Sequence, residues 1–136
     1  MKTSFTRTAL VAAMFSFASL VTISAARADT DQAKEVSTAA THAGLAAKAT
    51  DMKGTQMHLQ HVVNCLVGPK GKGFDAAPGN PCKDQGNGAI ADTKNSKQKK
   101  SLQAALAKAN AGLKAKDMAA AQKDATDAQN LLTPKT

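Results

Sequence analysis

The segment 68–93 carries six glycines and three prolines, and it restricts the folds open to this chain more than any other feature. Glycine and proline disfavour the interior of a helix, whereas alanine, which is frequent on both sides of the segment, is the best helix former. Apolar residues recur at spacings of four and three in Leu102, Leu106, Ala109 and Leu113, which is typical of an amphipathic helix. We therefore predict four helices, at about 31–52, 55–67, 95–115 and 117–132.

The connections near Gly54 and Lys116 are short, so each pair of helices should form an antiparallel hairpin. The sequence thus predicts an all-α fold, a four-helix bundle of two antiparallel hairpins joined by a long Gly/Pro-rich loop at 68–93. Such a long loop is uncommon in a small domain unless it is functional or fixed. A disulfide bond between the two cysteines, Cys65 and Cys82, would fix it and contribute about 3 kcal/mol to stability.

The N-terminal segment has the features of a cleaved signal peptide, residues 1–28. Lys2 and Arg7 precede an uncharged apolar run at 9–23, and Ala26-Arg27-Ala28 suits cleavage before Asp29. The run is short for a bilayer span, and no later stretch is apolar enough for one. We expect residues 29–136 to form a single exported domain, periplasmic or secreted, in a compartment that favours the disulfide.

The charge balance suggests an anionic partner or an acidic periplasmic protein. Removal of Lys2, Arg7 and Arg27 leaves fifteen lysines against ten carboxylates, a net charge of +5. Positive charge attracts anions, although lysines along alanine-rich helices are commonly a solvated face. Export makes nucleic acid an unsuitable partner.

Two histidines lie three residues apart on the second predicted helix, so His58 and His61 fall on one band of its surface. Counted outward from the turn near Gly54, His42 lies within about two helical turns of His61. Imidazoles are ligands of zinc, copper and nickel. The three rings are therefore candidate metal ligands, and their convergence depends on how the two helices are rotated.

Met52 and Met57 are the remaining candidate ligands. If Cys65 is in a disulfide it cannot act as a thiolate, and a set of histidine and methionine favours copper over zinc. The sequence thus predicts an exported transition-metal carrier or buffer. Catalysis is not expected, because the acids are dispersed and neither a nucleophile setting nor a Cys-x-x-Cys pair is present.

Two alternatives remain open. The chain could be a structural or protein-interaction module without metal, in which the long loop is the binding surface and the histidines are ordinary edge and surface residues. It could also bind haem b between His58 or His61 and a methionine, Met52 or Met118. The scarcity of aromatic residues makes for a poor haem pocket.

The sequence Val63-Asn64-Cys65 after His61, followed by Asn80-Pro81-Cys82, resembles a pattern of small exported proteobacterial proteins of unassigned role. The alanine-rich hairpins with helix-borne histidines are also similar to periplasmic small metal-binding proteins, helical bundles that bind several divalent metals, copper in particular. That resemblance implies a metal role for His42, His58 and His61. Residues 95–132 lack the histidine that is frequent in that family, so one or two sites are implied.

Overall fold

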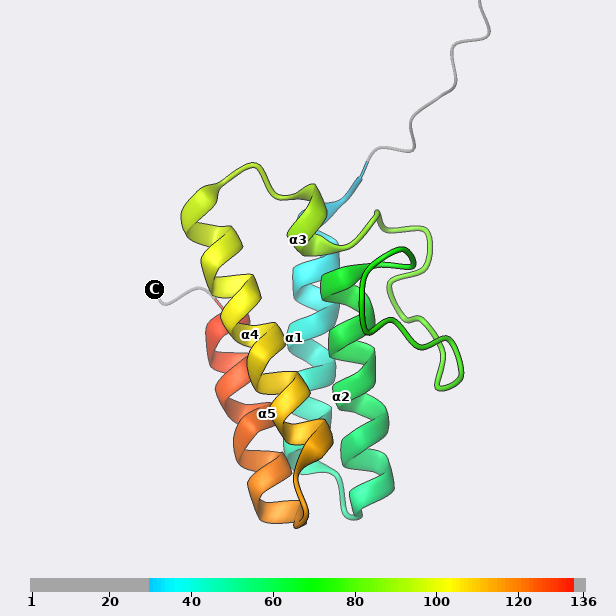
Figure 1. Ribbon diagram of the computed structural model, residues 1–136, viewed down its shortest axis with the longest axis vertical. Helices are drawn as coiled ribbons and strands as arrows, with labels where there is room; N and C mark the ends of the chain where they lie inside the picture. The colour runs from blue at the N-terminus through cyan, green and yellow to red at the C-terminus, as the bar shows by residue number, and fades with distance from the viewer. Residues whose placement is uncertain (1–29, 134–136) are drawn as a thin grey trace, which may run out of the picture.

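The computed structural model describes residues 30–133, and the predicted signal peptide lies outside these residues. The described chain forms five helices and no strand: α1 (Gln32–Lys48), α2 (Met52–Val67), α3 (Ala89–Asp92), α4 (Ser96–Lys114) and α5 (Met118–Leu132). The four long helices lie side by side, and the loop before α3 projects beside α2 (Figure 1). The prediction of an all-helical chain is confirmed.

The core is built from alanines on three helices and larger residues on the fourth. Helix α1 packs against α2 and α5, and α4 packs against α5 and α2. Helix α2 supplies Leu59, Val62, Val63 and Leu66, all buried. The other long helices contribute mainly buried alanines: Ala39, Ala43, Ala46, Ala105, Ala109, Ala121, Ala125 and Ala128. On α1 the buried face is therefore an alanine stripe, while Leu45 is 44% exposed.

Small residues allow the helix backbones to approach closely. A Cβ atom added to Gly112 on α4 would lie 2.8 Å from Leu59 Cδ1 and 3.2 Å from the Ala121 carbonyl oxygen. Gly112 therefore permits α2, α4 and α5 to meet at one point, which a side chain at this position would obstruct.

The first connection differs from the predicted one. Helix α1 ends at Lys48, and Met52, predicted to end that helix, instead begins α2. The Asp51 side chain accepts a hydrogen bond of 2.7 Å from the Gly54 amide and so caps α2. Gly54 thus lies within the first turn of α2 and does not terminate α1. The predicted loop at 68–93 likewise contains a short helix, α3.

The loop is held against α2 by a disulfide bond and by one buried amide. The predicted bond between Cys65 and Cys82 is confirmed. The fully buried Asn64 side chain accepts from the Asp75 amide at 3.0 Å and donates to the Asp75 and Gly79 carbonyl oxygens at 2.6 and 2.8 Å. Gln60 Nε2 donates to Asn64 Oδ1 at 3.0 Å, so all four hydrogen-bonding positions of the Asn64 amide are used.

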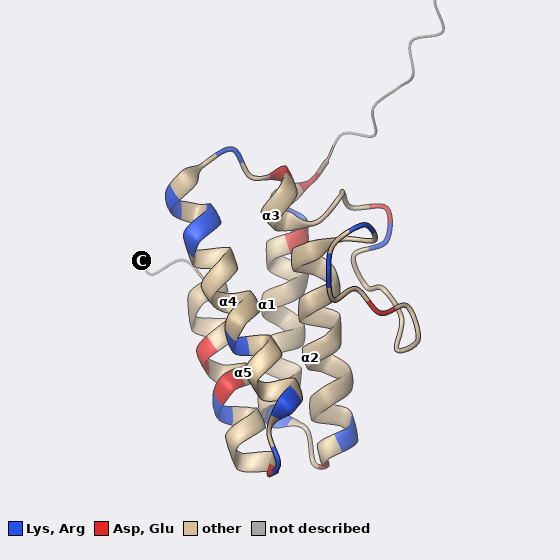
Figure 2. Ribbon diagram, in the orientation of Figure 1, with Lys and Arg blue, Asp and Glu red and all other residues tan. Residues whose placement is uncertain are grey.

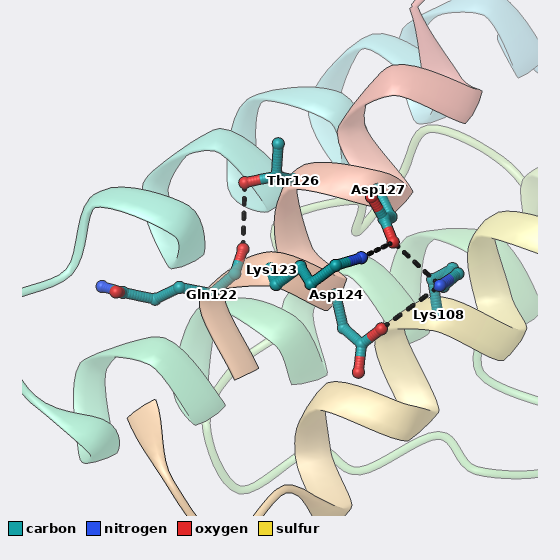
Figure 3. Close-up of polar contacts among 6 residues, drawn as sticks. All are labelled: Lys108, Gln122, Lys123, Asp124, Thr126 and Asp127. Carbon is teal, nitrogen blue, oxygen red and sulfur yellow. Dashed lines mark hydrogen bonds and ion pairs between the residues drawn. The ribbon is translucent and has the colours of Figure 1, made fainter. Parts of the chain in front are cut away.

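Charged residues are spread over the long helices and their connections (Figure 2), and most of those in the described part of the chain are exposed. Lys108 of α4 pairs with Asp124 and Asp127 of α5 at 3.4 and 2.8 Å, and Lys123 pairs with Asp127 at 3.0 Å (Figure 3). The hydrogen bonds from Lys108 and Lys123 lower the pKa of Asp127. Gln122, on the same helix, donates to the Ala49 carbonyl at the end of α1. The two Lys108 pairs link α4 to α5, whereas the Lys123–Asp127 pair lies within α5. Partly exposed ion pairs of this kind contribute little to stability.

Four lysines gather at the start of α4, and none of them forms an ion pair within residues 30–133. They are Lys94, Lys97, Lys99 and Lys100. The anionic partner suggested by the net charge stays a prediction. Across the described residues, no helix combines the length and the hydropathy needed to cross a membrane.

Candidate metal centre

The three histidines converge in the seam between α1 and α2. His42 Nδ1 lies 3.1 Å from His58 Nδ1 and 3.3 Å from His61 Nδ1. One ligand atom from each ring lies within 4.8 Å of the others, the one such group of His, Cys, Asp and Glu residues found in the described part of the chain. The structure therefore brings together the three imidazoles that were candidate metal ligands from the sequence.

The local sequence explains this convergence. Burial of the stripe through Ala39, Ala43 and Ala46 places His42 at the edge of that stripe that faces α2. The tight turn between Lys48 and Met52 then brings His58 level with it. A spacing of three residues places His61 on the same side of α2 as His58, one turn further along.

His61 is oriented by the loop. Its Nε2 atom donates a hydrogen bond of 2.7 Å to the carbonyl oxygen of Pro78, and the residue is 8% exposed. A neutral imidazole that carries its hydrogen on Nε2 has a lone pair on Nδ1. That lone pair faces the Nδ1 atoms of the other rings, as a metal ligand requires.

Burial keeps two of the rings neutral. Desolvation, together with charge repulsion from His61 and His58, lowers the pKa of His42 from 6.5 to about 4. Desolvation, followed by repulsion from His61, also lowers the pKa of His58. Because a metal ion binds the unprotonated imidazole, His42 and His58 are in the binding form at pH 7.

Two of the three spacings suit a single ion. Nitrogens at roughly 2.0–2.1 Å from a zinc-like ion in tetrahedral geometry lie about 3.3 Å apart, close to the 3.1 and 3.3 Å that separate His42 Nδ1 from the other two Nδ1 atoms. One hydrogen on His42 Nδ1, donated to the other two lone pairs, satisfies the same geometry. The centre can therefore hold one proton or one metal ion at its middle.

The sulfur candidates differ from one another. Cys65 is engaged in the disulfide and is not a thiolate ligand. Met52 packs against the core, and Met57 is 39% exposed on α2. Metal binding by either methionine stays a prediction, as does the role of Met118 in haem binding.

Two residues that orient the site were not nominated from the sequence, namely Pro78 and Asn64. The Pro78 carbonyl is a backbone group and leaves no signal in a sequence. Asn64 does leave one, because asparagine is a weak helix former and here lies in the interior of a helix between His61 and Cys65.

Comparison of the chain with protein-family models, curated proteins and solved structures finds no significant match.

Proposed function

We propose that this protein reversibly binds one transition-metal ion through the Nδ1 atoms of His42, His58 and His61. The observation that carries the proposal is the convergence of these atoms at 3.1 and 3.3 Å in a half-buried seam. The group includes no carboxylate or thiolate from the described residues. A centre with three neutral ligands leaves a coordination position for an exchangeable ligand, which favours a carrier or buffer over a permanent structural site.

Copper is the metal we favour. Imidazole nitrogens suit copper, zinc and nickel, and copper(II) has the highest affinity of the divalent first-row ions for such ligands. Met57 or Met52, if it completes the set, would further favour copper(I) because thioethers are soft ligands.

The haem alternative receives less support. Haem requires an axial histidine nitrogen that faces open space wide enough for a macrocycle. The Nδ1 atom of His61 instead faces His42, and its Nε2 atom donates to Pro78. A single ion fits between these rings, whereas a porphyrin would have to separate them.

We also propose that the four long helices form a four-helix bundle of two hairpins, α1–α2 and α4–α5. The proposal is supported by the packing of each long helix against two others and by their side-by-side arrangement (Figure 1). Export to the periplasm or beyond remains part of the proposal, and the disulfide is compatible with it.

The test of the metal site is a titration of the oxidised protein with copper(II) and, separately, zinc(II). We expect one ion per chain. Simultaneous replacement of His58 and His61 by alanine should abolish binding and preserve helicity, measured by circular dichroism. Lys53→Ala, an exposed change on the same helix, is the matched control and should bind like the parent. Unchanged stoichiometry in the double variant would overturn the proposal.

A further inference from the structure

The loop does more at this centre than cover it. The Pro78 carbonyl oxygen accepts the hydrogen bond that orients His61. Gly79 is also near the ring, since a Cβ atom added there would lie 3.7 Å from His61 Nε2. A hydrogen bond from a ligand's second nitrogen fixes the tautomer and orientation of the ring, and its loss commonly weakens metal binding.

Asn64 fixes the position of that carbonyl. It lies one helical turn after His61, on the same side of α2, and its amide binds the chain both before and after Pro78. The contacts are those to the Asp75 amide and carbonyl and to the Gly79 carbonyl, at 2.6 to 3.0 Å. The segment between is itself a tight turn, closed by a hydrogen bond of 3.0 Å from the Gly79 amide to the Ala76 carbonyl.

The disulfide supports the same arrangement from the next residue of α2. Cys65 follows Asn64 directly, and its partner Cys82 lies three residues after Gly79. Five consecutive residues of α2 therefore include the proposed ligand His61 and two residues, Asn64 and Cys65, that attach the loop orienting it.

We propose that Asn64 is a positioning residue of the metal centre: through Pro78 it holds His61 in the tautomer whose Nδ1 atom binds the ion. The inference rests on the proposed function. It differs from a purely structural role of Asn64, which would lower the stability of the loop and leave the metal affinity of the folded protein unchanged.

The experiment compares Asn64→Ala with Thr38→Val. Thr38 anchors the far end of the same loop through its hydrogen bond to Gln85. This hydrogen bond does not involve His61, Pro78 or Asn64, so Thr38→Val is the matched control. Copper(II) and zinc(II) affinities are measured by competition with a chromogenic chelator, and the imidazole ¹⁵N shifts of the metal-free proteins report the tautomer of His61.

We expect Asn64→Ala to lower the affinity by about 10- to 100-fold and to leave His61 in a mixture of tautomers, while Thr38→Val matches the parent in both respects. The double variant Cys65→Ala/Cys82→Ala, a second way to release the loop, should also lose affinity, and it serves if Asn64→Ala does not fold. Parental affinity in a folded Asn64→Ala protein would overturn the inference alone. Failure of the parent to bind either ion would overturn the proposed function, and the inference with it.

Discussion

His42 Nδ1 lies 3.1 Å from His58 Nδ1 across the seam between α1 and α2. Two imidazole nitrogens at this distance share one hydrogen or one ion, because two N–H groups directed at each other would repel. A second proton on the pair is therefore unfavourable. Burial, together with repulsion from His61 and from His58 across this contact, explains why the His42 ring resists protonation.

Acidification should destabilise the metal-free protein through His42. The pKa of His42 is lowered from 6.5 to about 4 in the folded state, so the unfolded chain binds more protons between these values. Stability is therefore present above pH 6.5 and is lost as the pH falls towards 4. Urea unfolding with a chelator at several pH values measures this loss. His42→Asn should show a flatter profile in that window, and an unchanged slope would contradict the prediction.

Glu35 should have the opposite pH dependence. It is 1% exposed, and burial is the main cause that raises its pKa from 4.5 to about 7, with Asp92 and Asp31 adding to the rise and a hydrogen bond from the Gly88 amide opposing it. Because the pKa of Glu35 is higher in the folded chain than in the unfolded chain, the folded state binds more protons between pH 4.5 and 7. Its contribution to stability is therefore fully present below pH 4.5 and is lost as the pH rises through 7.

Glu35→Gln should remove that loss, because the amide is neutral and keeps an oxygen for the Gly88 amide. The advantage of the variant over the parent should grow between pH 4.5 and 7 and then level off, at roughly 3 kcal/mol. Thermal unfolding of both proteins across this range is the measurement. A constant difference at all pH values would show that Glu35 does not titrate with folding.

Much of the helical architecture could be predicted, because its signals are local. The caps at Asn95 and Asp117 and the stripe through Leu102 and Ala109 depend on residues within one or two turns. Local signals also misled where two of them competed. Gly54 indicated a helix end, but Asp51, three residues earlier, caps α2 and extends it over that glycine.

The environment of the site could not be predicted in the same way. Glu35 is in the first turn of α1, where an exposed acid suits the helix dipole, yet α3 and the loop bury it. Asn64 contacts residues 11 and 15 positions away, and no periodicity encodes such pairs. The convergence of the histidines is intermediate between the local helix signals and these long-range contacts. The spacing of the histidines along the chain makes the convergence possible, but the rotation of α1 and α2 about their axes decides whether it occurs.

Two glycine substitutions should differ because of what their new Cβ atoms meet. At Gly112 the Cβ would press on Leu59 Cδ1 and on the Ala121 carbonyl, whereas at Gly44 it would meet the amide end of the Gln129 side chain. Backbone cannot move aside as a flexible side chain can. Gly112→Ala should therefore destabilise by about 1 to 3 kcal/mol, partly offset by the better helix propensity of alanine.

Gly44→Ala is the control and should be neutral or slightly stabilising, because Gln129 can rotate away and alanine favours the helix by up to about 1 kcal/mol. Urea unfolding at pH 7 gives both free energies. Equal effects of the two substitutions would contradict the close approach of α2, α4 and α5 at Gly112.

Metal should stabilise the folded protein by binding to the three-histidine centre. An ion that binds the folded chain alone, at a free concentration 100 times its dissociation constant, raises the free energy of unfolding by about 2.7 kcal/mol. The three ligands lie on two helices, so unfolding separates them, and the gain should appear as a higher melting temperature in copper(II) or zinc(II). His58→Ala/His61→Ala should show no gain, and Lys53→Ala should show the full one. An equal rise in the double histidine variant would mean that the ions bind elsewhere, for instance at surface carboxylates. The stabilisation would then not come from metal bound in the seam between α1 and α2.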